Sequence, residues 1–316
     1  MYVLGFDIGG TKCAVILADV KGENIEILKK EKTATDLSIK PEDMLERLCD
    51  IADKLLDGKE LYAIGVSCGG PLDSSNGVIL GPPNLKGWDE VYIKDILERR
   101  YKVKVNLQND ANACAVAEWK WGAGKGSKNM IFMTFGTGLG AGLILDGRLY
   151  TGTNDNAGEV GHIRLEDDGP VGYHKAGSFE GFCSGGGIAQ LGYTMALEKV
   201  KSGIYPAYFK EGMKPSDVTA KSVGDAADKG DETAIEVYKV CGEHLGKGLS
   251  VLIDVLNPER IVIGSVFARS RNLLWDSCKK VIDKEALPLS AQVCEVLPAS
   301  LGEQIGDYAA VSTALL

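Results

Sequence analysis

The sequence places one carboxylate, Asp110, where it can take part in acid–base chemistry. Residues 103–107 alternate apolar with polar side chains, which is a strand pattern, and an alanine-rich run that ends at Gly122 follows, which is a helix pattern. Asp110 is therefore expected at a strand-to-helix turn, where the helix dipole and free N–H groups favour an ionised carboxylate that can accept a proton from a substrate hydroxyl. Asn109 and Asp110 also suit helix capping, and capping is the simpler interpretation of these two residues taken alone.

A glycine turn early in the chain combines groups that suit phosphate. An apolar strand at 3–8 is followed by Gly9-Gly10-Thr11-Lys12 and a second strand at 13–18. We expect a hairpin in which glycine supplies positive φ. With Asp7 before it, the turn offers N–H groups, a hydroxyl, an ammonium and a carboxylate that suit a hydrated metal ion. The spacing is not that of a Walker A loop, and a glycine hairpin alone is more often a plain turn.

The same pattern recurs more than a hundred residues later. An apolar strand at 130–135 leads into Gly136-Thr137-Gly138-Leu139-Gly140, and another strand follows at 141–145. Glycine hairpins are common, so a chance repeat is an alternative, but we interpret the two copies as halves of a duplicated fold. Two such turns predict one nucleotide held between two domains.

Three charged or titratable residues have the types that bind vicinal hydroxyl groups. Glu159 and His162 stand close together among glycines, and Glu180 lies in an apolar, glycine-rich stretch. Sugar hydroxyls require donors and acceptors at fixed spacing, which these side chains offer. In the alternative interpretation, Glu159 is a solvated charge and His162 is a half-buried ring whose hydrogen bonds are satisfied.

Loops that follow predicted strands supply further candidates. The loop 68–71 contains Gly70, and the Pro/Gly-rich loop 81–89 contains Asn84. Both suit the wall of a small-molecule crevice, although ordinary surface loops explain them as well. A buried strand at 260–263 ends in Gly264-Ser265, a place where an adenosine can lie against the backbone or where the chain simply turns.

The composition argues against several classes of function. The chain has 316 residues, a length that favours two domains, and its formal net charge of −9 argues against nucleic acid or an anionic membrane as the main partner. Backbone N–H groups can still hold a small anion. We find no signal-peptide pattern and no apolar run long enough to span a bilayer. The eight cysteines are scattered without a C-x-x-C pair, which indicates a reducing cytoplasm.

Periodicity along the rest of the chain predicts an α/β protein. The helix expected at 41–56 begins with a proline and carries apolar residues at i, i+3 and i+4 spacing. Further strands are expected at 25–33, 61–67 and 292–297, and further helices at 186–199, 218–227, 232–257, 271–286 and 306–316.

Five motifs, in this order, resemble the ROK family of sugar kinases. They are DIGGTK from Asp7, NDAN from Asn109, the run from Phe135 to Gly152, GEVGH from Gly158, and NPERIVIG from Asn257. The resemblance covers essentially the whole chain, and the block 135–162 is highly specific. It implies a duplicated ribonuclease H-like fold, as in actin and Hsp70 ATPase domains, with two α/β domains and a central cleft. The implied domains are 1–112, to which a C-terminal helix at about 302–316 returns, and 113–301.

The resemblance also implies roles for individual residues. Asp110 would be the general base, and Asp7 would position Mg2+ through water. The residues implied in substrate binding are Gly70, Asn84, Asn109, Asp110, Glu159, His162 and Glu180. Those implied in nucleotide binding are Asp7, Gly9, Gly10, Thr11, Lys12, Gly136, Thr137, Gly138 and Gly264. The implied cofactors are ATP and Mg2+, and a homodimer is the oligomeric state expected from the family.

One departure from the family pattern concerns zinc. Many members hold a structural zinc ion with the histidine of GEVGH, which is His162 here, and three cysteines in a C-x-C-G-x-x-G-C-x-E pattern. Aligned on Glu180, those cysteine positions are Val171, Tyr173 and Ser178. Valine cannot ligate zinc, and tyrosine and serine are poor substitutes for thiolate, so we expect no structural zinc. Packing or a hydrogen bond must then orient His162.

The predicted function is ATP-dependent phosphorylation of a hexose hydroxyl, with the 6-OH of glucose expected because Pro83-Asn84-Leu85 is similar to the glucose-contacting loop of ROK glucokinases. Fructose, mannose, allose and N-acetylmannosamine are alternatives, since pocket shape decides among them. A ROK repressor would carry a helix-turn-helix ahead of the first glycine turn, which begins at Asp7, so we do not expect a nucleic-acid-binding segment. A non-catalytic sugar-binding or regulatory protein is the remaining alternative, and the presence of Asp110 beside Asn109 speaks against it.

Overall fold

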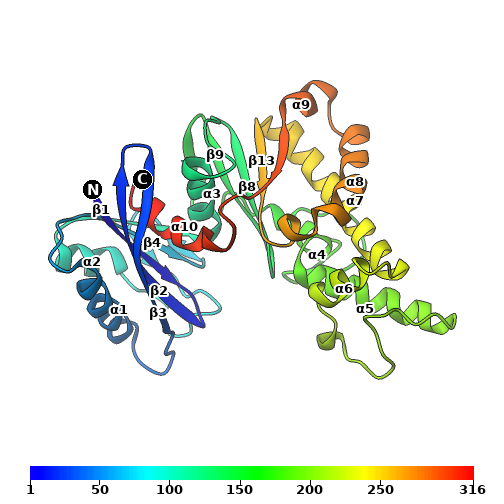
Figure 1. Ribbon diagram of the computed structural model, residues 1–316, viewed down its shortest axis with the longest axis horizontal. Coiled ribbons are helices and arrows are strands. Elements are labelled where there is room, and N and C mark those ends of the chain that lie inside the picture. Colours follow the sequence, from blue (N-terminus) through cyan, green and yellow to red (C-terminus); the bar gives the residue numbers. More distant parts are fainter. The chain divides into compact units, whose positions relative to one another are not determined.

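The computed structural model describes residues 1–316, which fold into two compact units. Figure 1 labels the α-helices and several of the strands. The first unit comprises Met1–Lys128, Gly142–Ala157 and Ser300–Leu316, and the second comprises Asn129–Ala141 and Gly158–Ala299. The C-terminal segment therefore belongs to the same unit as the N-terminal strands. The domain boundary expected at 112/113 stays a prediction.

A five-stranded sheet with the order β3-β2-β1-β4-β7 forms the centre of the first unit. Its strands are β1 (Tyr2–Ile8), β2 (Lys12–Lys21), β3 (Asn24–Ala34), β4 (Leu61–Cys68) and β7 (Lys104–Asn109). β1 is antiparallel to β2 and parallel to β4, and β7 is parallel to β4. The register pairs Ile8 with Cys68 and Cys68 with Asn109, so three parallel strands end at one edge of the sheet. In open α/β sheets this is the edge where ligands bind.

The two faces of this sheet carry separate hydrophobic cores. The α-helices of the unit are α1 (Pro41–Leu56), α2 (Ile93–Tyr101), α3 (Asp110–Trp121) and α10 (Ile305–Thr313). Leu4 and Phe6 pack with α1 and α2, whereas Val3 points to the other face and packs with α10, which lies against β1 and β4 (Figure 1). A Cβ on Gly65 would lie 2.1 Å from the carbonyl oxygen of Ala310, so glycine is required beneath this helix. The predicted final helix is confirmed, and its place on the first unit is set by this contact.

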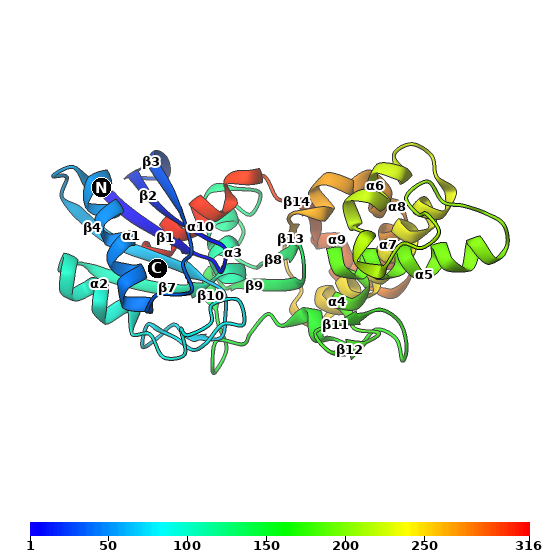
Figure 2. The ribbon, with the colours of Figure 1, turned by 90° about the horizontal axis from the view of Figure 1, so that it is seen from below.

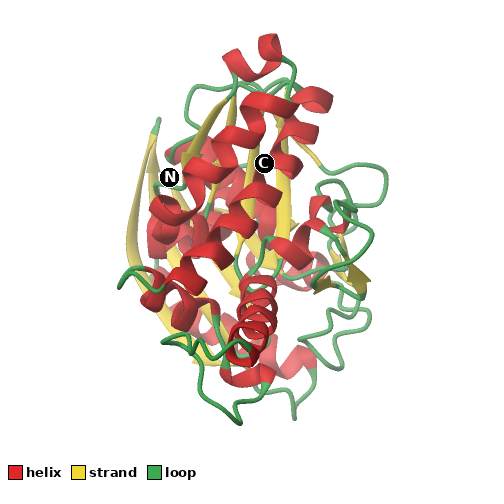
Figure 3. Ribbon diagram, turned by 90° about the vertical axis from the view of Figure 1, so that its right-hand side faces the viewer, coloured by secondary structure: helices red, strands yellow, loops and turns green.

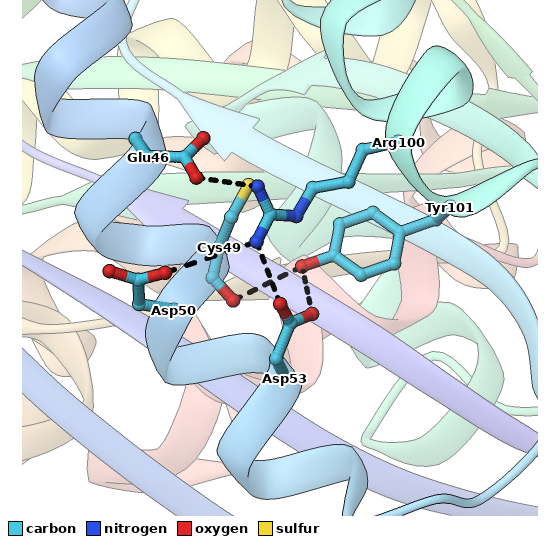
Figure 4. A network of polar contacts seen from close by, with 6 residues as sticks. All are labelled: Glu46, Cys49, Asp50, Asp53, Arg100 and Tyr101. Carbon is cyan, nitrogen blue, oxygen red and sulfur yellow. Dashed lines mark hydrogen bonds and ion pairs between the residues drawn. The ribbon is translucent and has the colours of Figure 1, made fainter.

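A polar network fixes α2 on α1 at the surface of the first unit (Figure 4). The guanidinium group of Arg100 lies 2.7 Å from both Glu46 Oε1 and Asp53 Oδ2. The hydroxyl group of Tyr101 lies 2.9 Å from Asp53 Oδ1 and 3.2 Å from the carbonyl oxygen of Cys49. The hydrogen bonds that Arg100 donates to Asp53 and Glu46 raise the pKa of Arg100 further above its usual value. The network joins the two helices on the outside of their shared core.

The second sheet repeats the strand order of the first. Its strands, in the order β10-β9-β8-β13-β14, are β8 (Met130–Phe135), β9 (Leu139–Leu145), β10 (Arg148–Tyr150), β13 (Arg260–Ile263) and β14 (Glu295–Pro298). β9 and β10 are antiparallel, whereas β13 is parallel to both β8 and β14. If the strands of each sheet are numbered one to five along the chain, their spatial order is 3-2-1-4-5 in both sheets. The predicted internal repeat and the α/β fold class are therefore confirmed.

Helices make up most of the second unit (Figure 3). They are α4 (Phe179–Phe182), α5 (Gly185–Lys201), α6 (Ala220–Ala227), α7 (Glu232–Leu256), α8 (Val266–Glu285) and α9 (Pro288–Val293). The helices α5, α6 and α8 all contact α7. Figure 2 shows α4 beside a small hairpin formed by β11 (Val171–Gly172) and β12 (Lys175–Ala176). None of the helices has the length and apolar composition that crossing a bilayer requires.

Some predicted bounds near the C-terminus differ from the structure. The strand expected at 292–297 begins only at Glu295, because Pro288 starts the short helix α9. α8 begins at Val266, directly after Ser265, and not at 271. α2 is absent from the predicted helices. The remaining short elements are β5 (Leu72–Asp73), β6 (Val78–Ile79) and the 3-10 helices η1 (Val160–His162), η2 (Pro215–Asp217) and η3 (Gly302–Gln304).

Candidate functional site

The edge where β1, β4 and β7 end gathers polar residues of the first unit. Asn109 is the last residue of β7 and the N-cap of α3, and its Oδ1 accepts the N–H of Asn112 at 2.7 Å. Asp110 is the first residue of α3, and its Oδ1 accepts the N–H of Ala111 at 2.8 Å. The predicted strand-to-helix turn is confirmed. The helix uses Asn109 as its cap, so the carboxylate of Asp110 is not needed for that purpose.

Asp110 combines exposed surface with a perturbed acidity. The residue is exposed, so a small molecule can reach its carboxylate. Contrary to the expectation that the helix N-terminus favours the ionised form, desolvation by the surrounding protein atoms raises the pKa of this carboxylate, and the N–H of Ala111 only opposes the effect. A carboxylate with a raised pKa accepts a proton more readily than a fully solvated one. These properties suit a general base.

A second carboxylate, Asp7, lies at the same edge, one residue before the end of β1. Desolvation, and after it the negative charge of Asp307, raises the pKa of Asp7 to about 6, and the positive charge of Lys30 opposes the shift. Asp307 on α10 is buried and forms an ion pair with Lys30 on β3. A Cβ on Gly306 would lie 3.4 Å from Asp7 Oδ2, so α10 begins directly against this carboxylate.

The first glycine turn, between β1 and β2, is confirmed as a turn, but positive φ is not the reason for its glycines. Neither Gly9 nor Gly10 has a positive φ. A Cβ on Gly10 would lie 2.1 Å from the carbonyl oxygen of Asn84, and a Cβ on Gly69 would lie 3.6 Å from Asn84 Oδ1. The loop that carries Asn84 therefore packs directly on the turn and also reaches the end of β4. Glycine at position 10 permits a close approach of two backbones.

The other groups predicted at this edge are open to solvent. Thr11, Lys12, Gly70 and Asn84 are all exposed. Together with Asp7 they supply a hydroxyl, an ammonium, an amide and a carboxylate. Mg2+ that arrives with a nucleotide is typically held by one or two carboxylates plus the phosphates and keeps several waters. The donor set of this edge fits such an ion bound to a phosphate chain.

In the second unit, the second glycine turn lies beside the end of β13. Gly185 donates its N–H to the carbonyl oxygen of Gly136 at 2.7 Å, and Thr137 is exposed. A Cβ on Gly136 would lie 3.8 Å from the hydroxyl oxygen of Ser265. The structure therefore brings together the turn predicted to hold phosphate and the turn at Gly264 predicted to lie near adenosine.

The sugar-binding candidates of the second unit come from two segments that touch. Glu159 precedes η1 and His162 ends it, and both residues are exposed. Glu180 lies on α4, which contacts both η1 and β11. A Cβ on Gly161 would lie 3.2 Å from the Cβ of Glu180. Glu180 Oε2 accepts the N–H of Leu139 at 2.9 Å, so this carboxylate also reaches the second glycine turn.

A model of the ROK family matches residues 3–315. The chain belongs to this family. It is 33% identical over 312 residues to a glucokinase of Halalkalibacterium halodurans, with 96% of this chain and 92% of the relative covered. It is also similar to the solved structure of a ROK family glucokinase from Streptomyces griseus in complex with glucose and AMPPNP, at 28% identity and a TM-score of 0.76, with 100% and 99% of the two chains covered. The transcriptional regulator NagC of Escherichia coli is 31% identical over 263 residues, which is 82% of this chain and 62% of NagC.

The segment that would hold zinc in many ROK proteins is held here by other contacts. Val171 lies in β11, Tyr173 in the turn that follows, and Ser178 caps α4. The carbonyl oxygen of His162 accepts a hydrogen bond from Lys175 Nζ at 2.7 Å. The imidazole ring of His162 packs edge-on against the ring of Tyr173. The chain contains no group of three or more His, Cys, Asp or Glu side chains arranged to hold a metal ion. The absence of zinc from this ROK protein stays a prediction.

Several residues that lie beside Asp7 or beside the second glycine turn are missing from the predicted site. Lys30 lies in a strand rich in charges, and Ser265 directly follows Gly264, which was predicted. No sequence pattern therefore singled out either residue as part of the site. Gly306 and Asp307 start the final helix, and an acidic first turn was the only sign of them. Leu139 acts through its backbone N–H, which a sequence pattern does not reveal.

Proposed function

We propose that this ROK protein transfers the γ-phosphoryl group of ATP to the 6-hydroxyl group of glucose. Sugar kinase activity is supported by family membership and by the glucokinases among its relatives. The observation that carries the proposal is the division of roles between Asn109 and Asp110. Asn109 caps α3, so the exposed carboxylate of Asp110, with its raised pKa, is available as a base.

In the proposed reaction, the sugar hydroxyl oxygen attacks the γ-phosphorus while Asp110 accepts the hydroxyl proton, and the bond between the γ-phosphorus and the bridging oxygen breaks to release ADP. General base catalysis of this kind typically contributes about 10²–10⁴-fold in rate. Asn84, Asn109, Gly70, Glu159, His162 and Glu180 bind and orient the sugar. Correct orientation of the attacking oxygen supplies much of the remaining acceleration in phosphoryl transfer.

The glycine turns are proposed to bind the phosphates of ATP. Backbone N–H groups of both turns and the side chains of Thr11, Lys12 and Thr137 face the negative charge, and Gly264 lies along the adenosine. Asp7 would hold Mg2+ that arrives with ATP, and the ion would supply neutralisation of charge on the phosphates. Fixed donors of this kind stabilise the charge that the transferring group carries in the transition state.

Glucose as the substrate is supported by two observations. The relative from Halalkalibacterium halodurans is a glucokinase, and the structure from Streptomyces griseus contains glucose. In this chain the loop with Asn84 packs against Gly10 and Gly69, which gives the amide a defined place at the end of β4. Fructose, mannose, allose and N-acetylmannosamine are the competing substrates. We further expect a homodimer, which light scattering on the purified protein would test.

The test is an ADP-release assay with MgATP against a panel of hexoses and N-acylhexosamines. We expect kcat/KM for glucose to exceed that for every other sugar by at least about tenfold, a ratio that contacts to a single hydroxyl group readily supply. Turnover that favours another sugar would contradict the glucose assignment and leave the kinase reaction standing. Sugar binding in calorimetry without any turnover would contradict the reaction itself and favour a regulatory role, as in NagC.

A further inference from the structure

Glu180 lies where three loops of the second unit meet. A Cβ on Gly172, in β11, would lie 2.7 Å from the Cβ of Glu180, and one on Gly161, in η1, would lie 3.2 Å from it. A Cβ on Gly138, in the second glycine turn, would lie 2.7 Å from Glu180 Oε2. Real Cβ atoms essentially never approach so closely as 2.7 Å. The β11 loop therefore needs glycine at position 172 to make room for Glu180, whereas a Cβ at position 138 would push the end of its carboxylate aside.

The backbone that carries Glu180 is also held in place. Ser178 caps the short helix α4, and Phe179, the neighbour of Glu180, is fully buried. A Cβ on Gly248 of α7 would lie 2.2 Å from the Phe179 ring, so this ring is pressed onto the α7 backbone. Glu180 therefore has little freedom to shift as a whole. Its carboxylate can change only by rotation of the side chain.

The two oxygens of this carboxylate have different surroundings. Oε2 accepts the N–H of Leu139 at 2.9 Å, directly after the turn Gly136–Gly138. Oε1 has no hydrogen-bond partner within the chain, and Glu180 itself is only partly buried. One oxygen thus holds the glycine turn while the other is available to a ligand.

We propose that Glu180 couples hexose binding to nucleotide binding, a role that rests on the proposed function. A sugar hydroxyl that donates to Oε1 fixes the rotamer of the carboxylate, and Oε2 then holds Leu139 and the phosphate turn in place. A nucleotide that fixes the turn likewise orders Oε2 and presents Oε1 to the sugar. Because each ligand orders the same carboxylate, the second ligand binds with a smaller loss of conformational entropy. Glu180 is therefore a positioning residue for the phosphates as well as a sugar ligand.

The test is a binding cycle, because such coupling is reciprocal for equilibrium constants and need not be for kcat. Calorimetry gives the Kd for glucose with and without MgAMPPNP, and the ratio of the two is the coupling factor. For the wild-type protein we expect a factor of at least about 5, the lower end of typical allosteric coupling. Glu180→Gln should lower it to less than about 2, because an amide holds the Leu139 N–H more weakly than a carboxylate does.

Two control variants carry the same Glu→Gln substitution at other positions of the second unit. Glu159→Gln should weaken glucose binding but keep the wild-type coupling factor, because Glu180 still holds the Leu139 N–H in that variant. Glu166→Gln should leave both quantities unchanged, since Glu166 pairs with Lys247 of α7 away from the turn. If Glu180→Gln binds glucose too weakly to titrate, Gly138→Ala replaces it. That variant displaces Oε2 but leaves the carboxylate present, so it should lower the coupling factor. The Kd for glucose alone should stay within about threefold of wild type, because losing a hydrogen bond to a charged group would change it by more.

The outcomes separate this inference from the proposed function. A wild-type coupling factor in Glu180→Gln, or in Gly138→Ala when that variant replaces it, would overturn the coupling role and leave Glu180 as a sugar ligand only. A factor below about 2 in the wild-type protein that still binds glucose would also overturn it, since typical coupling is larger. Absence of hexose binding in the wild-type protein would instead contradict the proposed function on which the inference rests.

Discussion

Asn109 Oδ1 accepts the N–H of Asn112 at 2.7 Å and is the N-cap of α3, whereas the next residue, Asp110, accepts only the adjacent N–H of Ala111 at its Oδ1. The sequence alone did not distinguish these roles, because asparagine and aspartate are both good caps. With the cap assigned to Asn109, substitutions at the two positions should have different effects. Asn109 should matter most for stability and Asp110 most for catalysis.

Asp110→Asn should lower kcat for glucose by about 10²–10⁴-fold and change the Kd for glucose by only a few fold, because the amide keeps the shape but cannot accept the proton. Steady-state kinetics and calorimetry on the same preparation measure both quantities. Asn109→Ala is the companion variant and should lower the free energy of unfolding by about 1 kcal/mol through loss of the cap. A kcat within tenfold of wild type in Asp110→Asn would remove Asp110 from the role of base.

Asp7 should make the protein less stable at neutral pH than it would otherwise be. Its pKa is about 6 in the folded protein against 3.8 for a free side chain, so the folded state binds the proton more tightly. Stability therefore falls as the pH rises from about 4 to about 6, and the loss is complete above that range. A pKa difference of this size corresponds to at most about 3 kcal/mol.

Asp7→Asn cannot ionise, so it should raise the free energy of unfolding by about 1–2 kcal/mol at pH 7.5 and by much less at pH 4. Urea unfolding at the two pH values measures the difference. The same variant should bind MgATP more weakly, because the proposed contact to the hydrated ion is lost. A gain in stability that is equal at both pH values would show that ionisation of Asp7 is not its cause.

Gly10→Ala should disturb the loop that carries Asn84. The new Cβ would lie 2.1 Å from the Asn84 carbonyl oxygen, so either the turn or the loop must move. We expect a loss of about 1–3 kcal/mol in stability and a fall of about 10–100-fold in kcat/KM, because small displacements of positioning groups have large kinetic effects. Gly70→Ala is the matched control for stability, since a Cβ there would have no neighbour within 4 Å.

The fold was largely predictable because its strands and helices follow simple periodicities. The stripe on α1, the strand-to-helix turn at Asp110 and the repeated glycine turns all have local sequence patterns. The reason for the glycines was not predictable. Gly10 is required by the backbone of Asn84, which is distant in sequence, and no local rule records such an approach.

The unpredicted part of the site depends on long-range contacts of the same kind. Lys30 and Asp307 meet only because β3 and α10 belong to one unit, and their charges then act on Asp7. A charged residue in an exposed strand and an acid in a first helical turn are common in isolation. Their pairing becomes visible only when the chain is folded.

Arg100 should stabilise the protein through the network between α1 and α2 (Figure 4). Arg100→Met keeps the apolar stem and removes the charge, and we expect a loss of about 1 kcal/mol, the upper end for partly exposed ion pairs. Thermal and urea unfolding measure it, and high salt should reduce the difference because it screens exposed charges. The neighbouring Arg99→Met is the control, since Arg99 contacts only the carbonyl oxygen of Asp95 and should cost less than about 0.5 kcal/mol. Equal losses in the two variants would contradict a specific role for the network.

We propose that the chain phosphorylates the 6-hydroxyl of glucose with Asp110 as the base. The most direct measurement is 31P NMR of the product formed from MgATP and glucose, with 6-deoxyglucose as the matched substrate that lacks the hydroxyl group. We expect glucose 6-phosphate from the wild-type protein, none from 6-deoxyglucose, and a rate from Asp110→Asn lower by about 10²–10⁴-fold. Phosphorylation at another position, or undiminished product from Asp110→Asn, would contradict the account.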